Sequence, residues 1–162
     1  MPQSVASMLP FAIVLACLGA AIWFLLSREM ALGVWLLAAF LVGHGLIHLL
    51  FFVPQPAAAA GAPEWPFDMA RSWAVTGAGL DVGTVRVIGA ALIAVVAVCF
   101  VAAGLATVGV IVPPNWWRAA VVASAAASIV LLALFFNPQL VLGLAIDSAL
   151  LMVVVAAVWA PA

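Results

Sequence analysis

Five long apolar stretches limit what this sequence can fold into. They cover residues 5–27, 30–53, 84–112, 118–136 and 139–159. A helix of about 18 or more apolar residues is long enough to cross the hydrocarbon core of a bilayer. Because backbone polar groups in lipid must be hydrogen-bonded internally, we predict an all-α integral membrane protein with five transmembrane helices in a bundle.

The composition agrees with this fold class. Hydrophobic residues make up 70% of the 162 residues and charged residues only 6%. A net charge of −1 without a basic cluster argues against nucleic acid as a partner. We expect residues 1–162 to form a single transmembrane domain whose main partner is the lipid bilayer, either as a homo-oligomer or within a larger membrane complex.

Most of the spans are joined by short connections. These are residues 28–29, 113–117 and 137–138, so the spans that they join are expected to pack as antiparallel hairpins. The N-terminal residues MPQSVAS carry no basic side chain, and the apolar run that follows is too long for a typical secretory signal. We therefore expect the first span to be retained.

One connection is long, residues 54–83, and it contains the segment EWPFDMARSWAV, Glu64 to Val75. Pro66 suits the first turn of a helix, and the aromatic side chains suit the headgroup layer of a membrane. We predict a short interfacial helix here, with an ordered loop as the alternative. Four of its residues are expected to form a lid or interface: Asp68, Arg71, Ser72 and Trp73.

The orientation in the membrane follows only weakly from charge. Side A denotes the side with the N-terminus, the long connection and the turn at residues 137–138, and side B the opposite side. Each side carries two arginines, Arg71 and Arg86 on side A and Arg28 and Arg118 on side B, so a positive-inside count is tied. The acidic residues Glu64, Asp68 and Asp81 all lie on side A, but acidic residues weigh little in this rule. We expect side A outside.

Three titratable side chains lie deep inside two of the spans. Asp147 lies in the fifth span, roughly 3 Å from its centre, and His44 in the second, roughly 4 Å from its centre, both in the half toward side A. His48 follows His44 by one helical turn and so shares its face. We predict that the three line one polar pocket that opens to side A, because ionisable groups at such depth are costly and commonly functional.

Two hypotheses for these residues involve no cofactor. In the first, Asp147 accepts a hydrogen bond from His44, and the pair only holds two helices together, as in an accessory or structural subunit of a membrane complex. In the second, the carboxyl group and the imidazoles pass protons or bind a cation. A chain with five spans and no evident inverted repeat is small for a transporter, so the second hypothesis favours an oligomer.

Two further hypotheses involve a cofactor. His44, His48 and Asp147 make a possible three-ligand set for Zn²⁺, although HGLIH lacks the glutamate of the H-E-x-x-H metalloprotease motif. Haem needs a ligand on each face of its ring, so two histidines on one helix face do not suit it. One histidine with Met152, or with a histidine from a second copy, remains open, as does a single histidine that holds a pentacoordinate haem or a pigment.

Small residues mark faces for close helix packing. In the fourth span Ala119, Ala123 and Ala127 recur at four-residue spacing, beside a second row formed by Ala120, Ser124 and Ser128. We expect the two serines to bond to their own helix backbone. Gly43, Gly45 and Gly143 are expected to let a neighbouring helix or a ligand approach His44 and Asp147.

Four motifs occur in order along the chain: HGLIHLLFF, the loop PFDMARSW, the tripeptide WWR, and G-x-x-x-D in the last span. In this pattern residues 40–155 resemble small uncharacterised multi-span membrane proteins of bacteria. The resemblance implies a bacterial plasma (inner) membrane protein and no particular activity.

The sequence thus leads us to expect a small polytopic membrane protein that binds an ion, a proton or a small amphiphile at a buried pocket of His44, His48 and Asp147, in a role related to transport. The alternative is a non-catalytic accessory subunit, and after it a membrane protein that binds a metal or haem. We do not expect an enzyme, because no second carboxylate lies at that depth to act as a general base.

Overall fold

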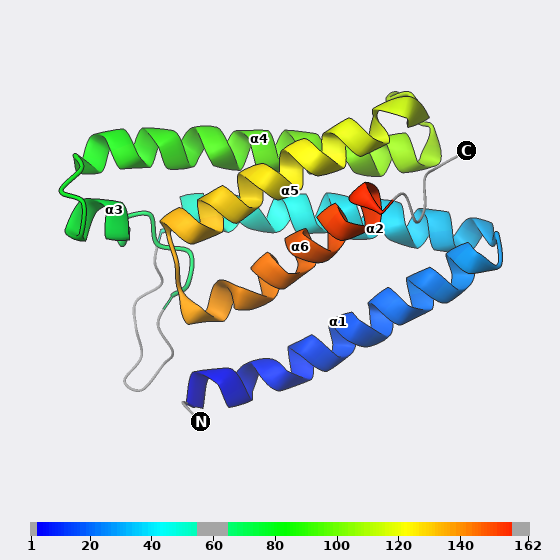
Figure 1. Ribbon diagram of the computed structural model, residues 1–162, viewed down its shortest axis with the longest axis horizontal. Helices are drawn as coiled ribbons and strands as arrows, with labels where there is room; N and C mark the ends of the chain where they lie inside the picture. The colour runs from blue at the N-terminus through cyan, green and yellow to red at the C-terminus, as the bar shows by residue number, and fades with distance from the viewer. Residues whose placement is uncertain (1–2, 55–64, 157–162) are drawn as a thin grey trace.

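The computed structural model describes residues 3–54 and 65–156, which form helices joined by turns (Figure 1). No strand occurs in these ranges. Five stretches, three of them with an adjoining 3₁₀ turn, are long and apolar enough to cross a membrane, at 18 to 27 residues each. The α-helices of these stretches are α1 (Gln3–Ser27), α2 (Ala31–Ile47), α4 (Val82–Val108), α5 (Trp117–Leu134) and α6 (Val141–Val155). The all-α fold and the five long apolar helices are therefore confirmed.

Helix boundaries differ from the expected ones where turn chemistry intervenes. The third span was expected to reach residue 112, but α4 ends at Val108 because Gly109 adopts a left-handed conformation, with φ 67°. The second span was expected to be helical to residue 53; instead, α2 ends at Ile47 and a 3₁₀ helix, η1 (His48–Phe52), follows. The last residues expected in the fifth span, 157–159, lie outside the described residues.

Helix α4 has the most extensive contacts in the bundle. It packs mainly against α5 and α2, and α5 in turn packs against α6. Helix α1 meets α2 at the turn that joins them and diverges from α2 toward its own N-terminal end (Figure 1). The buried core has two parts, one around Phe100 and Trp117 and one around Phe51 and Phe135.

Glycines bring α2 and α4 together. A Cβ atom on Gly45 would lie 2.6 Å from the Cβ atom of Phe100, and one on Gly104 would lie 2.8 Å from the carbonyl oxygen of Ala38. A methyl group does not fit at either position without a shift of the helices. Gly43, which was also expected to permit an approach, has no atom within 4 Å of the corresponding point.

The row of α5 that faces the interior is the one with the serines. Ala120, Ser124 and Ser128 are buried, whereas Ala119 and Ala123 are exposed. Of the two rows of small residues in this span, the structure therefore uses the second for packing.

The long connection contains less helix than expected. Only α3 (Trp73–Thr76) is helical within it, and residues 65–72 form bends and turns; Glu64 lies outside the described residues. Ser72 initiates α3 and also donates its hydroxyl to the carbonyl of Leu134 at 2.8 Å, while the Trp73 indole donates to the carbonyl of Ala133 at 2.7 Å. The connection thus satisfies carbonyls that the last turn of α5 leaves without an intrahelical partner.

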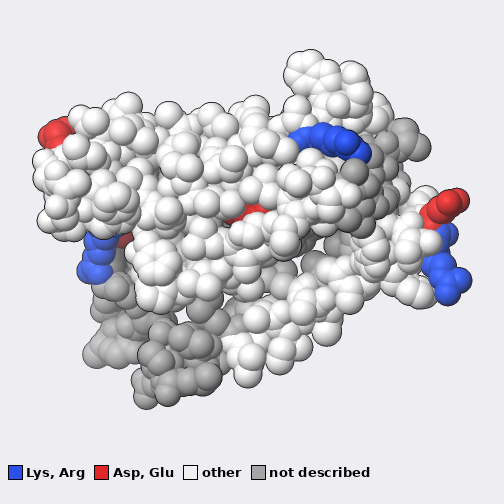
Figure 2. Space-filling view, viewed as in Figure 1, with Lys and Arg blue, Asp and Glu red and all other residues white. Residues whose placement is uncertain are grey.

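The surface between the two ends of the bundle is apolar. The basic side chains and most of the acidic ones lie toward the ends, with a broad, almost uncharged band between them in which a single small acidic patch is visible (Figure 2). Large apolar side chains are exposed along this band on every long helix, including Phe11 at 69%, Trp35 at 60% and Val98 at 66%. Such a continuous apolar surface is far larger than the patches that soluble monomers expose.

Candidate functional site

The three titratable residues that were singled out in the sequence lie together in the bundle. His44 is in the last turn of α2, His48 begins η1, and Asp147 lies in the middle of α6. One ligand atom from each of the three lies within 4.8 Å of the others. The Asp147 side chain is fully buried and that of His44 is 7% exposed. His44 Nε2 and Asp147 Oδ1 lie 2.9 Å apart, so the two side chains that were placed at similar distances from the span centres are in contact.

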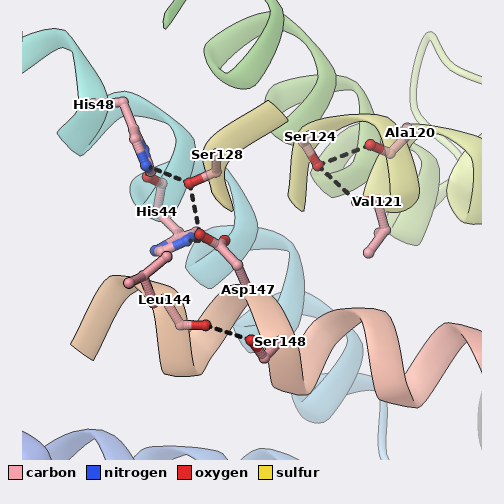
Figure 3. Close-up of polar contacts among 9 residues, drawn as sticks. All are labelled: His44, His48, Ala120, Val121, Ser124, Ser128, Leu144, Asp147 and Ser148. Carbon is pink, nitrogen blue, oxygen red and sulfur yellow. Dashed lines mark hydrogen bonds and ion pairs between the residues drawn. The ribbon is translucent and has the colours of Figure 1, made fainter. Parts of the chain in front are cut away.

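A closed set of hydrogen bonds joins these residues (Figure 3). His44 Nε2 lies 2.9 Å from Asp147 Oδ1, and Ser128 Oγ lies 2.6 Å from Asp147 Oδ2. His48 Nε2 lies 2.8 Å from the same Ser128 Oγ, and His48 Nδ1 lies 2.9 Å from the backbone carbonyl oxygen of His44. We call these four residues, His44, His48, Ser128 and Asp147, the polar cluster.

Ser128 is the member of the cluster that the sequence did not reveal. It was expected to bond to its own helix, as Ser124 does to the carbonyls of Ala120 and Val121. Ser128 instead reaches Asp147 on α6 and His48 on η1 (Figure 3). Its place one turn after Ser124 on a row of small residues was a signal of helix packing but not of this contact.

Aromatic rings enclose the cluster on the side of His44. The Phe40 ring stacks on the His44 ring at 5.8 Å with an interplanar angle of 8°, and Phe100 of α4 meets it edge-on at 4.9 Å. His48 is 3% exposed. The polar groups are therefore shielded from water, and their electrostatic interactions are stronger than at a surface.

The helix changes its geometry at the cluster. In an α-helix the backbone N–H of His48 would donate to the carbonyl of His44, but the His48 side chain bonds to that carbonyl. The backbone N–H of His48 donates instead to the carbonyls of Gly45 and Leu46. The second span therefore tightens into a 3₁₀ helix from His48 onward, as α-helices commonly do at their C-terminal ends.

The side chains that were expected to line an open pocket bond to one another. The residues expected to form a lid or interface lie in the long connection. Asp68 and Arg71 form an ion pair there at 3.5 Å, and Ser72 and Trp73 are bonded to the end of α5. Two of these four residues thus fasten the connection to α5, and a lid over the cluster stays a prediction.

A cavity of about 290 Å³ lies at the side A end, between η1 and the long connection. Phe51, Phe67, Asp68 and Arg86 are among its lining residues. Phe51 is one turn beyond His48 along η1, is 3% exposed, and packs against Phe67 and Phe135. The cavity thus begins one helical turn beyond His48, where Phe51 lines it.

Several possible metal-binding atoms of the cluster form hydrogen bonds with one another. His44 Nε2, His48 Nε2 and both carboxylate oxygens of Asp147 take part in the hydrogen bonds given above, so a Zn²⁺ ion at these atoms would replace those bonds. Met152, considered as a partner of histidine on haem, is 65% exposed and outside the cluster.

No protein-family model, curated protein or solved structure matches the chain. The resemblance to small bacterial multi-span proteins stays a prediction, and the function is inferred from the site itself.

Proposed function

We propose that this chain is an integral membrane protein that takes up and releases a proton at the polar cluster. The observation that carries the proposal is the burial of the Asp147 carboxyl group, 0% exposed, in the middle of an apolar helix and 2.9 Å from His44 Nε2. An ionised carboxylate without a compensating positive charge is strongly disfavoured in such surroundings. Proton binding, by the carboxyl group or by an adjacent imidazole, removes this cost.

The membrane assignment rests on the five apolar helices and the apolar band between the charged ends. We place the protein in a bacterial plasma membrane with side A, and thus the N-terminus and the long connection, outside. Since a lone bundle of this size is small for a transporter, the proton site is proposed to serve transport or energy coupling within an oligomer or a larger complex.

A structural role is the second candidate, and one observation favours it. The hydrogen bonds of the cluster join α2, α5 and α6, so the same contacts hold three helices together. Hydrogen bonds of this kind contribute about 1–2 kcal/mol at most to helix association in membranes. In a purely structural clasp the protonation state would stay constant over the physiological pH range.

The two candidates differ in their response to pH. Full-length protein in mild detergent, with ¹⁵N-labelled histidine, is followed by NMR and by infrared absorption of carboxyl groups between about pH 5 and 9, the range over which histidine environments titrate. We expect the NMR signals of a histidine ring or the infrared band of a carboxyl group to change reversibly with pH. This change should be lost in Asp147→Asn. Ser148→Ala is the matched control, since Ser148 bonds only to its own helix at Leu144. NMR and infrared signals that stay constant over this pH range would contradict the proton site and support the structural clasp.

A further inference from the structure

The hydrogen bonds of the polar cluster can be counted against the hydrogens that its groups supply. There are four contacts: His48 to the His44 carbonyl, His48 to Ser128, Ser128 to Asp147, and His44 to Asp147. Each contact needs one hydrogen between its two atoms. Two neutral histidines, one hydroxyl and an ionised carboxylate supply only three such hydrogens, because a neutral imidazole has one N–H and a carboxylate has none.

The acceptor at one end of the cluster fixes the direction of the bonds. A backbone carbonyl oxygen can only accept, so His48 Nδ1 must donate to His44 O. If His48 is neutral, its Nε2 then has a lone pair and needs a hydrogen from Ser128. Ser128 has one hydrogen, and Asp147 Oδ2 at 2.6 Å needs the same one. One contact would therefore join two acceptors.

One added proton resolves this conflict in two ways. In the first arrangement His48 is an imidazolium, its Nε2–H donates to Ser128, and Ser128 donates to the Asp147 carboxylate. In the second, His48 is neutral, Asp147 Oδ2 carries the proton and donates to Ser128, and Ser128 donates to His48 Nε2. All four contacts are satisfied in each arrangement.

We infer that the polar cluster holds one proton per chain and that the Ser128 hydroxyl relays it between His48 and Asp147. This inference rests on the proposed function and names the path of its proton. In the transfer the Nε2–H bond of His48 breaks as a new O–H bond forms on Ser128. The original O–H bond of Ser128 breaks as an O–H bond forms on Asp147 Oδ2, so an ion pair becomes two neutral groups without any other reactant.

The relay has a direction in the bundle. His48 lies one helical turn beyond His44 on the side of η1, the long connection and the cavity that Phe51 lines. Four residues of helix correspond to about 6 Å along the axis. A proton that moves from His48 through Ser128 to Asp147 therefore moves about one turn deeper from side A.

Other charges do not face the cluster among the described residues. Helix α2 and η1 contribute only His44 and His48, and α6 contributes only Asp147. Helix α5 offers Ser128, with Arg118 in its first turn, and α4 offers the Phe100 ring, with Cys99 beside it in the chain and Arg86 near its start. The titration of the cluster is therefore governed by its own members.

The test uses the two histidines as reporters. Both histidines of the chain belong to the cluster, so ¹⁵N-labelled histidine reports on nothing else. In wild-type protein we expect the His48 ring and the Asp147 carboxyl band to change at one common pH midpoint, with the band assigned through its loss in Asp147→Asn. In Ser128→Ala the change should split into two midpoints at least about one pH unit apart, since groups that share a proton titrate as a unit.

Two variants serve as controls. Ser124→Ala, one turn earlier on the same face, removes a hydroxyl that bonds only to its own helix, and the common midpoint should persist. Ser128→Thr keeps a hydroxyl at the relay position and should also retain it. The wild-type midpoints are decisive even if Ser128→Ala does not fold.

The outcomes separate the relay from the proposed function. Different midpoints for His48 and Asp147 in the wild-type protein, or a common midpoint that survives in Ser128→Ala, would overturn the relay and leave a proton site. No titration of either histidine or of Asp147 would overturn the relay and the proposed function together.

Discussion

Two serines of α5 show how one residue type takes two roles within a single turn. Ser124 donates to carbonyls of its own helix, which is the usual behaviour of serine in an apolar helix. Ser128 instead forms a hydrogen bond with Asp147 Oδ2 at 2.6 Å, because α6 brings a carboxyl group within reach. The difference lies in the neighbouring helix and not in the serine.

At the start of α4 a single carboxylate acts by capping. Asp81 accepts hydrogen bonds from the backbone N–H of Thr84 at 2.8 Å and from its hydroxyl at 3.2 Å. These bonds hold the pKa of Asp81 below its ordinary value. Since the folded-state pKa is lowered, the charged cap stabilises the fold above the unfolded-state pKa of about 3.9, and this contribution is lost as the pH falls through the folded-state pKa.

We therefore predict that Asp81→Ala lowers the temperature of unfolding at neutral pH and that the gap to wild type narrows as the pH falls below about 4. Thermal unfolding in mild detergent, followed by circular dichroism, measures the unfolding temperatures of the variant and the wild type at each pH. Asp81→Asn keeps an acceptor for the Thr84 amide and has no charge to titrate. The stabilisation that this cap contributes should therefore not change with pH. A gap between Asp81→Ala and wild type that stays constant down to pH values of about 3 would contradict this account.

Among the elements, the contact of α2 with α4 decides how the histidine turn is held. Gly45 follows His44 directly and faces Phe100, whose ring meets the His44 ring at 4.9 Å. A bulkier residue at this position would separate the helices and move the aromatic wall of the cluster. Gly43, two residues earlier, faces open space.

This pair of glycines yields a prediction with its own control. Gly45→Ala should lower the free energy of unfolding by about 1–3 kcal/mol, because the new methyl group would lie 2.6 Å from the Phe100 Cβ atom. Gly43→Ala should be neutral or raise it by about 0.5–1 kcal/mol, since alanine is the better helix former. Denaturant unfolding in micelles measures both, and equal effects of the two substitutions would argue against the close contact.

For the whole molecule, the charged ends and the apolar band are those expected of a protein that crosses a bilayer. A cavity of about 260 Å³ lies between α1, α2 and α6, lined almost wholly by apolar side chains, among them Phe40. Phe40 also stacks on His44, so its ring contacts both this cavity and the polar cluster.

The proposed orientation can be tested by labelling. In a background with Cys17 and Cys99 replaced by alanine, Leu80→Cys lies on side A and Arg28→Cys on side B, and both positions are exposed. We expect a membrane-impermeant thiol reagent to label Leu80→Cys in intact cells and Arg28→Cys only after permeabilisation. The reverse pattern would place side A inside. If neither cysteine is labelled before permeabilisation, the protein is not in the plasma membrane.

The polar cluster was only partly predictable. The neighbourhood of His44 and Asp147 followed from their equal distances from the span centres, because a helix rises by a constant 1.5 Å per residue. The part taken by Ser128 and the 3₁₀ turn at His48 did not follow, because each depends on which side chains of α5 and α6 face α2. The short helix expected over residues 64–75 was wrong for residues 65–72, which form bends and turns held by local hydrogen bonds such as that from the Ala70 amide to Asp68.

The amino-acid sequence by itself determined the five long helices and their all-α class, since apolar runs of that length leave the backbone no partner other than itself in lipid. It also determined the depth of the three titratable residues. Only the tertiary structure decided which row of α5 faces inward, and hence that Ser128 stands between His48 and Asp147. The physical reason is that depth is set along each helix by its own geometry, whereas rotation about each helix axis is set by contacts with its neighbours.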